Sequence, residues 1–264
     1  MGGVRGIDPK REIRRAFDRS AIRYDRFARL QRQVADRLLA LLPWELPSGW
    51  WVDLGSGTGY CGHRLRQRSP GRNLLFLDLA EAMVRQTGGV VGDIERLPLR
   101  DRSASLLLSN LAFQWCLDPG RPLLEAKRVL RPGGLLAFST LVEGTLWELK
   151  AAWRAVDGDG HVNDFVSFEE IQARLETTGW SGRLFRERRV LRYATVFQLL
   201  QELKGVGTRN LHPSRPRALT TRSKLREMAR SYSEICGGEV RATFEIAYAI
   251  CRELDPAEYP RKVY

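Results

Sequence analysis

Short apolar runs alternate with helix-forming segments through the middle of the chain. The runs lie at residues 50–54, 73–79, 89–93, 104–110 and 134–141. Helical spacing is expected between them, through Leu65, from Ala82 to Gln86, and from Pro122 to Leu130. Apolar runs that do not alternate with polar residues, and that helices separate, indicate a parallel sheet buried on both faces. The pattern therefore predicts a doubly wound α/β core.

Helical periodicity is the main signal on either side of this core. Before it, apolar residues recur at helical spacing from Lys10 to Leu42, and Pro43 follows. After it, residues 144–183 are expected to be helical, in the two segments 145–156 and 167–180. Next are expected a strand at 189–195, helices at 196–206 and 220–235, and a final strand at 240–251.

The length of 264 residues suits one large domain. We therefore expect a single domain over residues 1–264. Within it we expect a helical cap at 9–42, a cofactor-binding core at 50–140, and helical substrate-side elements at 144–183 and 195–235. No apolar run approaches the roughly 20 residues of a membrane span, and the first residues carry no secretory apolar region. Four scattered cysteines predict neither a metal site nor a disulfide framework, so a cytoplasmic location is expected.

A glycine-rich turn follows the first apolar run. The stretch DLGSGTG places Gly55, Gly57 and Gly59 directly after Asp53. Backbone N–H groups in such a turn can approach a small anionic or zwitterionic ligand at the start of a helix. A carboxylate next to the phosphates of a dinucleotide would repel them, whereas next to an ammonium group it attracts. The spacing GxGxG with Asp53 therefore favours the methionine part of S-adenosylmethionine (SAM) over a dinucleotide.

Further polar residues end the next predicted strands. Asp78 can accept both hydroxyls of a ribose, and Asp93 is placed to receive the exocyclic amine of adenine. Asn110 ends the following strand, close to where a methionine moiety would lie. Ligands bind at the carboxyl ends of strands in open α/β sheets. Any one of these carboxylates could be a helix cap or a surface charge, but the ordered set favours a SAM site.

These motifs resemble class I SAM-dependent methyltransferases over residues 50–140. DLGSGTG, FLDLA, GDIERLPL, SNLAFQWC and LRPGG stand in the order and spacing of that family. The resemblance implies a Rossmann-like, mostly parallel seven-stranded sheet with an N-terminal helix and a helical lid insertion. It also implies that the glycine turn cradles the methionine moiety, that Asp78 holds the ribose, and that Asp93 meets the adenine with Ile94 against its ring.

The flanking sequence is similar to the malonyl-acyl-carrier-protein O-methyltransferases of biotin synthesis. The similar stretches are AFDRSAIRYDRFARLQRQVADRLL, SNLAFQWC, FSTLVEGTLWELKAAWRAVD and LLQELKGVGTRN, within residues 9–250. This resemblance implies methylation of the free carboxylate of a malonyl thioester, on a carrier protein or on coenzyme A. The methyl ester would then prime the synthesis of the pimeloyl part of biotin.

A malonyl carboxylate is ionised at neutral pH, so methyl transfer to it needs no general base. Catalysis would rest on alignment and desolvation, with a cation or hydroxyl donors holding the carboxylate. The candidates are Tyr24, His161, Asn163, Arg209 and the neighbouring Asn210. Tyr24 could instead be a core aromatic, His161 a hydrogen-bonded structural histidine, and Arg209 a solvated charge.

The formal net charge of +12 is the one extreme of the composition. An acidic acyl carrier protein would be steered by a basic face, either Arg15, Arg19 and Arg23 or a later segment with Lys204, Arg209, Arg215 and Arg217. Solvated surface charge explains the excess equally well. An RNA methyltransferase, a methyltransferase of another small carboxylic acid or quinone precursor, and a protein that only binds SAM are alternatives. No aromatic and basic RNA-binding pattern occurs, so no nucleic acid partner is expected. The stretch STLVEGTLWEL argues against another small acid as the substrate.

Overall fold

The computed structural model describes residues 8–157, 160–208, 210 and 220–253. The contacts within the chain divide it into two compact units. Unit 1 contains the described residues of Met1–Ala28, Glu143–Phe165 and Arg188–Glu245, and unit 2 those of Arg29–Val142, Val166–Glu187 and Ile246–Tyr264. The expectation of a single domain over the whole chain stays a prediction.

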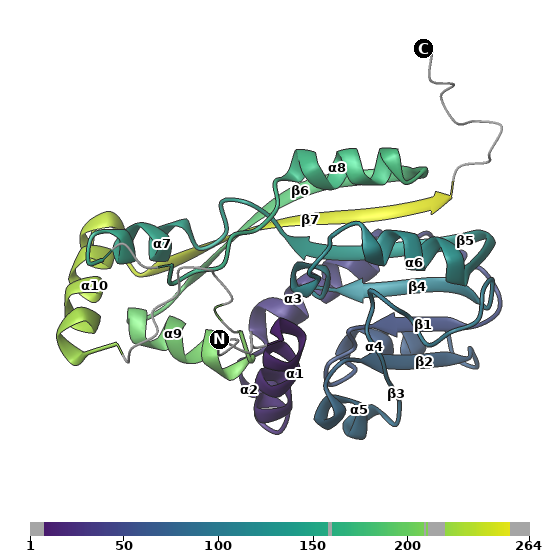
Figure 1. Ribbon diagram of the computed structural model, residues 1–264, viewed down its shortest axis with the longest axis horizontal. Helices are drawn as coiled ribbons and strands as arrows, with labels where there is room; N and C mark the ends of the chain where they lie inside the picture. The colour runs from purple at the N-terminus through teal and green to yellow at the C-terminus, as the bar shows by residue number, and fades with distance from the viewer. Residues whose placement is uncertain (1–7, 158–159, 209, 211–219, 254–264) are drawn as a thin grey trace, which may run out of the picture. The chain divides into compact units, whose positions relative to one another are not determined.

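A mostly parallel seven-stranded sheet is the main feature of the fold, as predicted. Its strand order is β3-β2-β1-β4-β5-β7-β6, and Figure 1 shows β5, β4, β1 and β2 side by side. Neighbouring strands from β3 to β5 run parallel, whereas β5 and β7 are antiparallel, with Leu141 opposite Ile246. The strands are β1 (Trp51–Leu54), β2 (Leu74–Asp78), β3 (Val90–Val91), β4 (Ala104–Asn110), β5 (Leu130–Leu141), β6 (Trp180–Arg192) and β7 (Arg241–Glu253).

The central strands of unit 2 are buried because their side chains are apolar on both faces. All four residues of β1 are buried, and so are the first six of β4. Leu107, Leu136 and Phe138 belong to the core cluster of buried side chains. A parallel sheet that helices cover on both sides needs such continuous apolar strands. The absence of alternation in the sequence was therefore the correct signal for this sheet.

The helices of unit 2 follow the predicted alternation with the strands. They are α3 (Arg29–Leu41), α4 (Tyr60–Arg68), α5 (Glu81–Thr87), the 3-10 turn η1 (Phe113–Trp115), α6 (Arg121–Val129) and α8 (Phe168–Thr177). α3 packs against α4, α5 against β2, and α6 against β5. β6 begins at Trp180, so the expectations of a helix up to Arg183 and of a strand starting at Arg189 were wrong.

Unit 1 is built largely from helices. They are α1 (Pro9–Ser20), α2 (Tyr24–Phe27), α7 (Trp147–Arg154), α9 (Val196–Gly205) and α10 (Arg222–Ile235). α10 packs against α7 and α9, and α2 packs against α9 (Figure 1). A side chain at Gly205 would place its Cβ 2.2 Å from the ring of Phe27, so the glycine permits the close approach of α9 to α2.

The prediction of one N-terminal helix from Lys10 to Leu42 was wrong. The chain leaves the helix after Ser20, forms a turn that exposes Ile22 fully, and is interrupted again at Ala28. α1 buries Ile13 within unit 1, and α3 buries Val34 within unit 2. Both helices keep a 3.6-residue apolar spacing, so the sequence pattern continues across a break in the backbone. Within the described residues, no helix is both long and apolar enough to cross a membrane.

Candidate cofactor site

The turn between β1 and α4 adopts a conformation that favours glycine. Gly55, Gly57 and Gly59 have φ angles of 66°, 54° and 84°, in the left-handed region. The N–H groups of residues 55 and 56 both donate to the carbonyl of Leu77 on β2, at 2.8 and 3.0 Å. A side chain at Gly55 would bring its Cβ to 2.4 Å from the Cβ of Ala112. The turn is therefore held between β2 and the segment that follows β4.

Asp53 is buried beneath the first turn of α4. It is 1% exposed, and its Oδ2 accepts a hydrogen bond from the N–H of Gly62 at 2.8 Å. That N–H is one of the groups at a helix start that have no partner within the helix. Burial raises the pKa of the Asp53 carboxyl from its usual 3.8 to about 7; the Gly62 hydrogen bond lowers it, and the charge of Asp78 raises it further. Attraction of an ammonium group by Asp53 stays a prediction.

Asp78 ties the end of β2 to the glycine turn. Its Oδ2 accepts from the N–H of Gly57 and its Oδ1 from the N–H of Ala80, each at 2.8 Å. An ionised carboxylate has about four acceptor sites, so Asp78 can serve several donors at once. Asp78 is 9% exposed, and its role in accepting the ribose hydroxyls stays a prediction.

Asp93 and Ile94 follow β3. The Oδ1 of Asp93 accepts from the N–H of Glu95 at 3.0 Å, and its backbone forms an isolated bridge with Arg96. Ile94 is 8% exposed and belongs to the core cluster. These contacts fix the tight turn that places a carboxylate and an apolar side chain next to each other at the end of β3.

Asn110 ends β4 and connects it to β5 and α3. Its Oδ1 accepts from the hydroxyl of Ser139 at 2.9 Å, and its Nδ2 donates to the backbone carbonyl of Gln31 at 3.0 Å. The Ser139 hydroxyl also accepts from the N–H of Leu111, whose φ of 52° is uncommon for a residue with a side chain. The end of β4 is thus held in one conformation by neighbours on both sides.

The strand order brings the predicted cofactor residues of unit 2 to one edge of the sheet. Parallel strands end at the same edge, and the order β3-β2-β1-β4 places Asp93, Asp78, the glycine turn and Asn110 in succession along it. Neighbouring strands lie about 4.8 Å apart, so the row extends over ~14 Å. The edge presents carboxylates at one end. The N–H groups of residues 55, 56, 57 and 59 in the glycine turn donate within the protein, so the expectation that they approach a ligand stays a prediction.

Two polar side chains at this edge were missed in the sequence. The hydroxyl of Ser56 and the Oε1 of Gln31 are buried, and neither has a hydrogen-bond partner within the described protein. Buried polar atoms without partners are rare, so each invites a ligand group. Together with the glycine turn, a donor and an acceptor fit the zwitterionic end of SAM. Ser56 belongs to the motif itself, whereas no signal in the sequence connects Gln31 to it.

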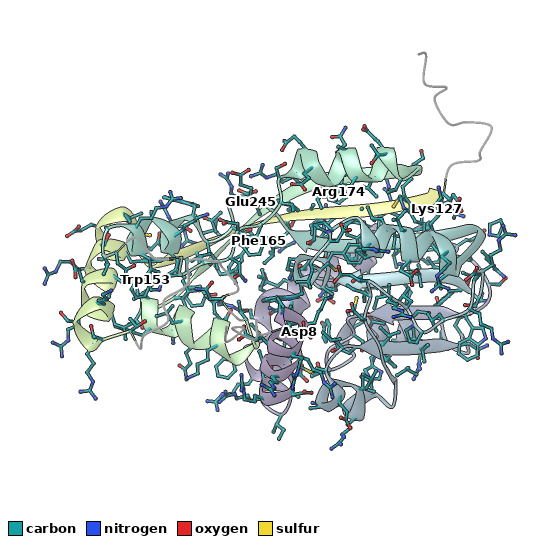
Figure 2. The ribbon with its side chains drawn as sticks, viewed as in Figure 1. Asp8, Lys127, Trp153, Phe165, Arg174 and Glu245 are labelled. Carbon is teal, nitrogen blue, oxygen red and sulfur yellow. The ribbon has the colours of Figure 1, made fainter. Side chains whose placement is uncertain are left out.

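The predicted substrate residues belong to unit 1 where they are described. The His161 Nε2 lies 2.9 Å from Oδ1 of Asp157, and its ring stacks on Trp153 at 3.7 Å between centroids; Figure 2 labels Trp153 on α7. Lys224 donates to the other oxygen of Asp157 at 2.8 Å. We call these four residues the Asp157 cluster.

The remaining candidates for substrate binding are Tyr24, Asn163, Asn210 and Arg209. Tyr24 begins α2 and is half-buried, as is Asn163. Asn210 donates to the backbone carbonyl of residue 160 at 2.5 Å. Arg209 lies outside the described residues, as do Arg215 and Arg217. The roles of Tyr24, His161, Asn163 and Arg209 stay predictions. Among the described residues no group of three or more His, Cys, Asp or Glu side chains is placed to hold a metal ion.

Comparison with known proteins adds to this geometry. Residues 52–138 match the model of a family described as "Methyltransferase domain". The chain is 42% identical to a Malonyl-[acyl-carrier protein] O-methyltransferase of Methylococcus capsulatus, over 95% of this chain and 96% of that protein. It is 34% identical to a Biotin biosynthesis bifunctional protein of Saccharophagus degradans, over 90% of this chain and 46% of that protein.

A solved structure shares the fold. The crystal structure of a putative methyltransferase from Bacillus halodurans matches with a TM-score of 0.60, over 84% of this chain and all of that one, at 15% identity. At this identity the structural match shows the fold and no particular substrate.

Proposed function

We propose that this chain, which belongs to the malonyl-[acyl-carrier protein] O-methyltransferase family, transfers the methyl group of SAM to the free carboxylate of a malonyl thioester. The observation that carries the proposal is the extent of the similarity, 42% identity over 95% of the chain. The methyltransferase domain alone matches residues 52–138. The similarity therefore also includes the helices of unit 1, which a general methyltransferase would not need to share. The methyl ester would prime the synthesis of the pimeloyl part of biotin.

In this proposal the carboxyl edge of unit 2 binds SAM, which supplies an electrophilic methyl group. The glycine turn would receive the methionine part, with Asn110 close by. Asp78 would accept the ribose hydroxyls, and Asp93 with Ile94 would hold the adenine. The support is the succession of these residues along the edge, where Asp78 is bonded to the N–H of Gly57 in the glycine turn.

The proposed reaction needs no proton transfer. A malonyl carboxylate is ionised near neutral pH and is already a nucleophile. The task of the protein is to hold the carboxylate in line and to exclude water. Tyr24, His161, Asn163 and Arg209 are the proposed groups for this task. A phenol, an imidazole, an amide and a guanidinium can each donate to a carboxylate without taking a proton from it.

The proposed partner is an acidic acyl carrier protein that presents the malonyl group. Arg15, Arg19 and Arg23 are exposed on and after α1, and Lys204 is exposed on α9. Basic side chains on unit 1 would attract an acidic carrier and raise its association rate. The cytosol is the proposed compartment, because the four cysteines are free thiols.

A methyl-transfer assay with labelled SAM tests the proposal directly. Malonyl-carrier protein, malonyl-coenzyme A, a second small dicarboxylic acid and bulk RNA are offered separately at equal concentration. We expect label on the malonyl thioesters. Alkaline hydrolysis of the new methyl ester should release that label as methanol. Label on RNA alone, or on the free dicarboxylic acid alone, would overturn the proposed substrate.

A further inference from the structure

We propose that Gln31 and Ser56 bind the amino-acid end of the methyl donor, with the Gln31 amide oxygen accepting from its ammonium group and the Ser56 hydroxyl donating to its carboxylate. The inference rests on the proposed SAM site and adds to it a residue of α3, outside the methyltransferase motifs. It assigns two side-chain contacts to the ligand and a direction to each hydrogen bond.

The backbone of Gln31 is hydrogen-bonded to Asn110 at the end of β4. Its backbone carbonyl receives the Nδ2 of Asn110 at 3.0 Å, and Ser139 holds the other end of that amide. The side chain of Gln31 therefore starts from a fixed point at the carboxyl edge. Its Oε1 is buried and has no partner in the described protein. An amide oxygen only accepts hydrogen bonds, so the group that satisfies it must be a donor.

Ser56 lies in the glycine turn that follows the neighbouring strand β1. It is 9% exposed, and its backbone N–H is used by Leu77, whereas its hydroxyl has no partner in the described protein. Gly55 lies so close to Ala112 that an added Cβ would overlap it, so this turn packs against the residues just after β4. Ser56 therefore follows β1, and the backbone of Gln31 is bonded to Asn110 at the end of the adjacent strand β4, in the same unit.

The order of strands decides which end of the ligand meets these atoms. Asp78 and Asp93 follow β2 and β3, on the opposite side of β1 from β4. Acidic acceptors on that side suit the hydroxyl and amine donors of a nucleoside. The remaining part of SAM is an α-amino acid, which carries one cluster of donors and one of acceptors. An acceptor from Gln31 and a hydroxyl from Ser56 complement it, and burial makes each hydrogen bond to a charged group strong.

Isothermal titration calorimetry with two ligands separates this role from a structural one. S-adenosylhomocysteine carries the amino-acid end, and 5′-methylthioadenosine lacks it. We expect Gln31→Ala and Ser56→Ala each to weaken S-adenosylhomocysteine about tenfold, and to change the affinity for methylthioadenosine by less than twofold. Gln33→Ala, on the same helix, is the matched control and is expected to bind both ligands like the unmodified protein.

Gln31→Glu tests the direction of the hydrogen bond. Its carboxylate still accepts from an ammonium group, so S-adenosylhomocysteine is expected to bind at least as tightly as to the unmodified chain. If Gln31→Glu loses as much affinity as Gln31→Ala, Gln31 faces the carboxylate instead and the assignment is overturned. Equal losses for both ligands, or none for either, would overturn the role itself.

Two further readouts keep the outcomes distinct. Thermal unfolding without ligand should change little in Gln31→Ala, because the buried Oε1 that is removed has no hydrogen bond to lose; a marked drop would show a structural role and overturn the proposal. Failure of the unmodified protein to bind S-adenosylhomocysteine would refute the proposed SAM site. Binding of S-adenosylhomocysteine without methylation of malonyl thioesters would refute the proposed substrate and leave the assignment of Gln31 intact.

Discussion

The carboxyl edge of unit 2 and the Asp157 cluster of unit 1 satisfy their polar groups in different ways. At the edge, Asp53 and Asp78 accept from backbone N–H groups, and the side chains of Ser56 and Gln31 have no protein partner. In the cluster, Asp157 receives both His161 and Lys224. Unmet hydrogen-bonding capacity marks a place for a ligand. This contrast indicates that polar side chains paired within the protein stabilise the fold, whereas buried atoms without a protein partner are the candidates for ligand contacts.

Packing around the glycine turn should give the largest effect. In Gly55→Ala, the new Cβ meets Ala112 at 2.4 Å, and the φ of 66° is strained for alanine. We expect a loss of about 4 kcal/mol in the free energy of unfolding, measured with urea, and a large loss of S-adenosylhomocysteine affinity. Gly71→Ala is the control, because its φ is 77° and nothing lies within 4 Å of the added Cβ.

The control should lose only the strain term, about 1 kcal/mol, and keep its ligand affinity. Equal losses of unfolding free energy and of ligand affinity in the two variants would show that close packing against Ala112 does not constrain the glycine turn.

Asp53 should make the stability of the protein depend on pH. Its pKa is about 7 in the folded protein and near 3.8 when unfolded, so the folded state holds the proton more tightly. Stability is then greatest at low pH and falls as pH rises towards 7. Between pH 5 and pH 8, ionisation of Asp53 should lower the free energy of unfolding by about 3 kcal/mol. We expect urea unfolding to show this fall, and Asp53→Asn, which keeps an acceptor for Gly62, to show a smaller one. The same fall in both proteins would contradict the prediction.

Breaking the Asp157 cluster should affect stability and spare the cofactor. Asp157→Asn weakens the hydrogen bonds from Lys224 and His161, and we expect a loss of about 2 kcal/mol in the free energy of unfolding. Its affinity for S-adenosylhomocysteine should not change. Asp164→Asn is the control, because its side chain is 61% exposed and it pairs with Lys150 at the surface.

A different result would alter the comparison between the regions. If Asp157→Asn kept its stability but raised the KM for the malonyl carrier, the cluster would serve the substrate through His161 and would not contribute to stability.

Reversing surface charge on unit 1 should have the smallest effect. Arg19→Glu combined with Arg23→Glu is expected to raise the KM for malonyl-carrier protein severalfold, and less so as salt increases. The KM for malonyl-coenzyme A and the affinity for S-adenosylhomocysteine should not move. Arg100→Glu combined with Arg102→Glu, exposed on unit 2, provides the control. Equal effects of the two double variants would show that net charge, and not this surface, matters.

Several parts of the molecule follow from local rules and were predictable. The sheet was visible because buried parallel strands must be apolar on both faces, as in β1 and β4. The glycine turn was visible because left-handed backbone at Gly55, Gly57 and Gly59 favours glycine. The positions of Asp78, Asp93 and Asn110 at strand ends then followed from the alternation of strands and helices.

Other features depend on contacts between distant residues. The break after Ser20 leaves the apolar period unchanged, so it becomes visible only where α1 and α3 bury their faces in different units. The burial of Asp53 beneath Gly62 depends on how α4 packs.

By itself, the sequence determined the strands, the turn and the family, because each of these is written in residues that lie near one another along the chain. Only the tertiary structure showed that Asn110 reaches the carbonyl of Gln31, 79 positions earlier, and that the side-chain oxygen of Gln31 is buried without a partner. The physical reason is that satisfaction of a hydrogen bond is a property of three-dimensional neighbours. A sequence lists donors and acceptors, and the fold decides which of them remain for a ligand.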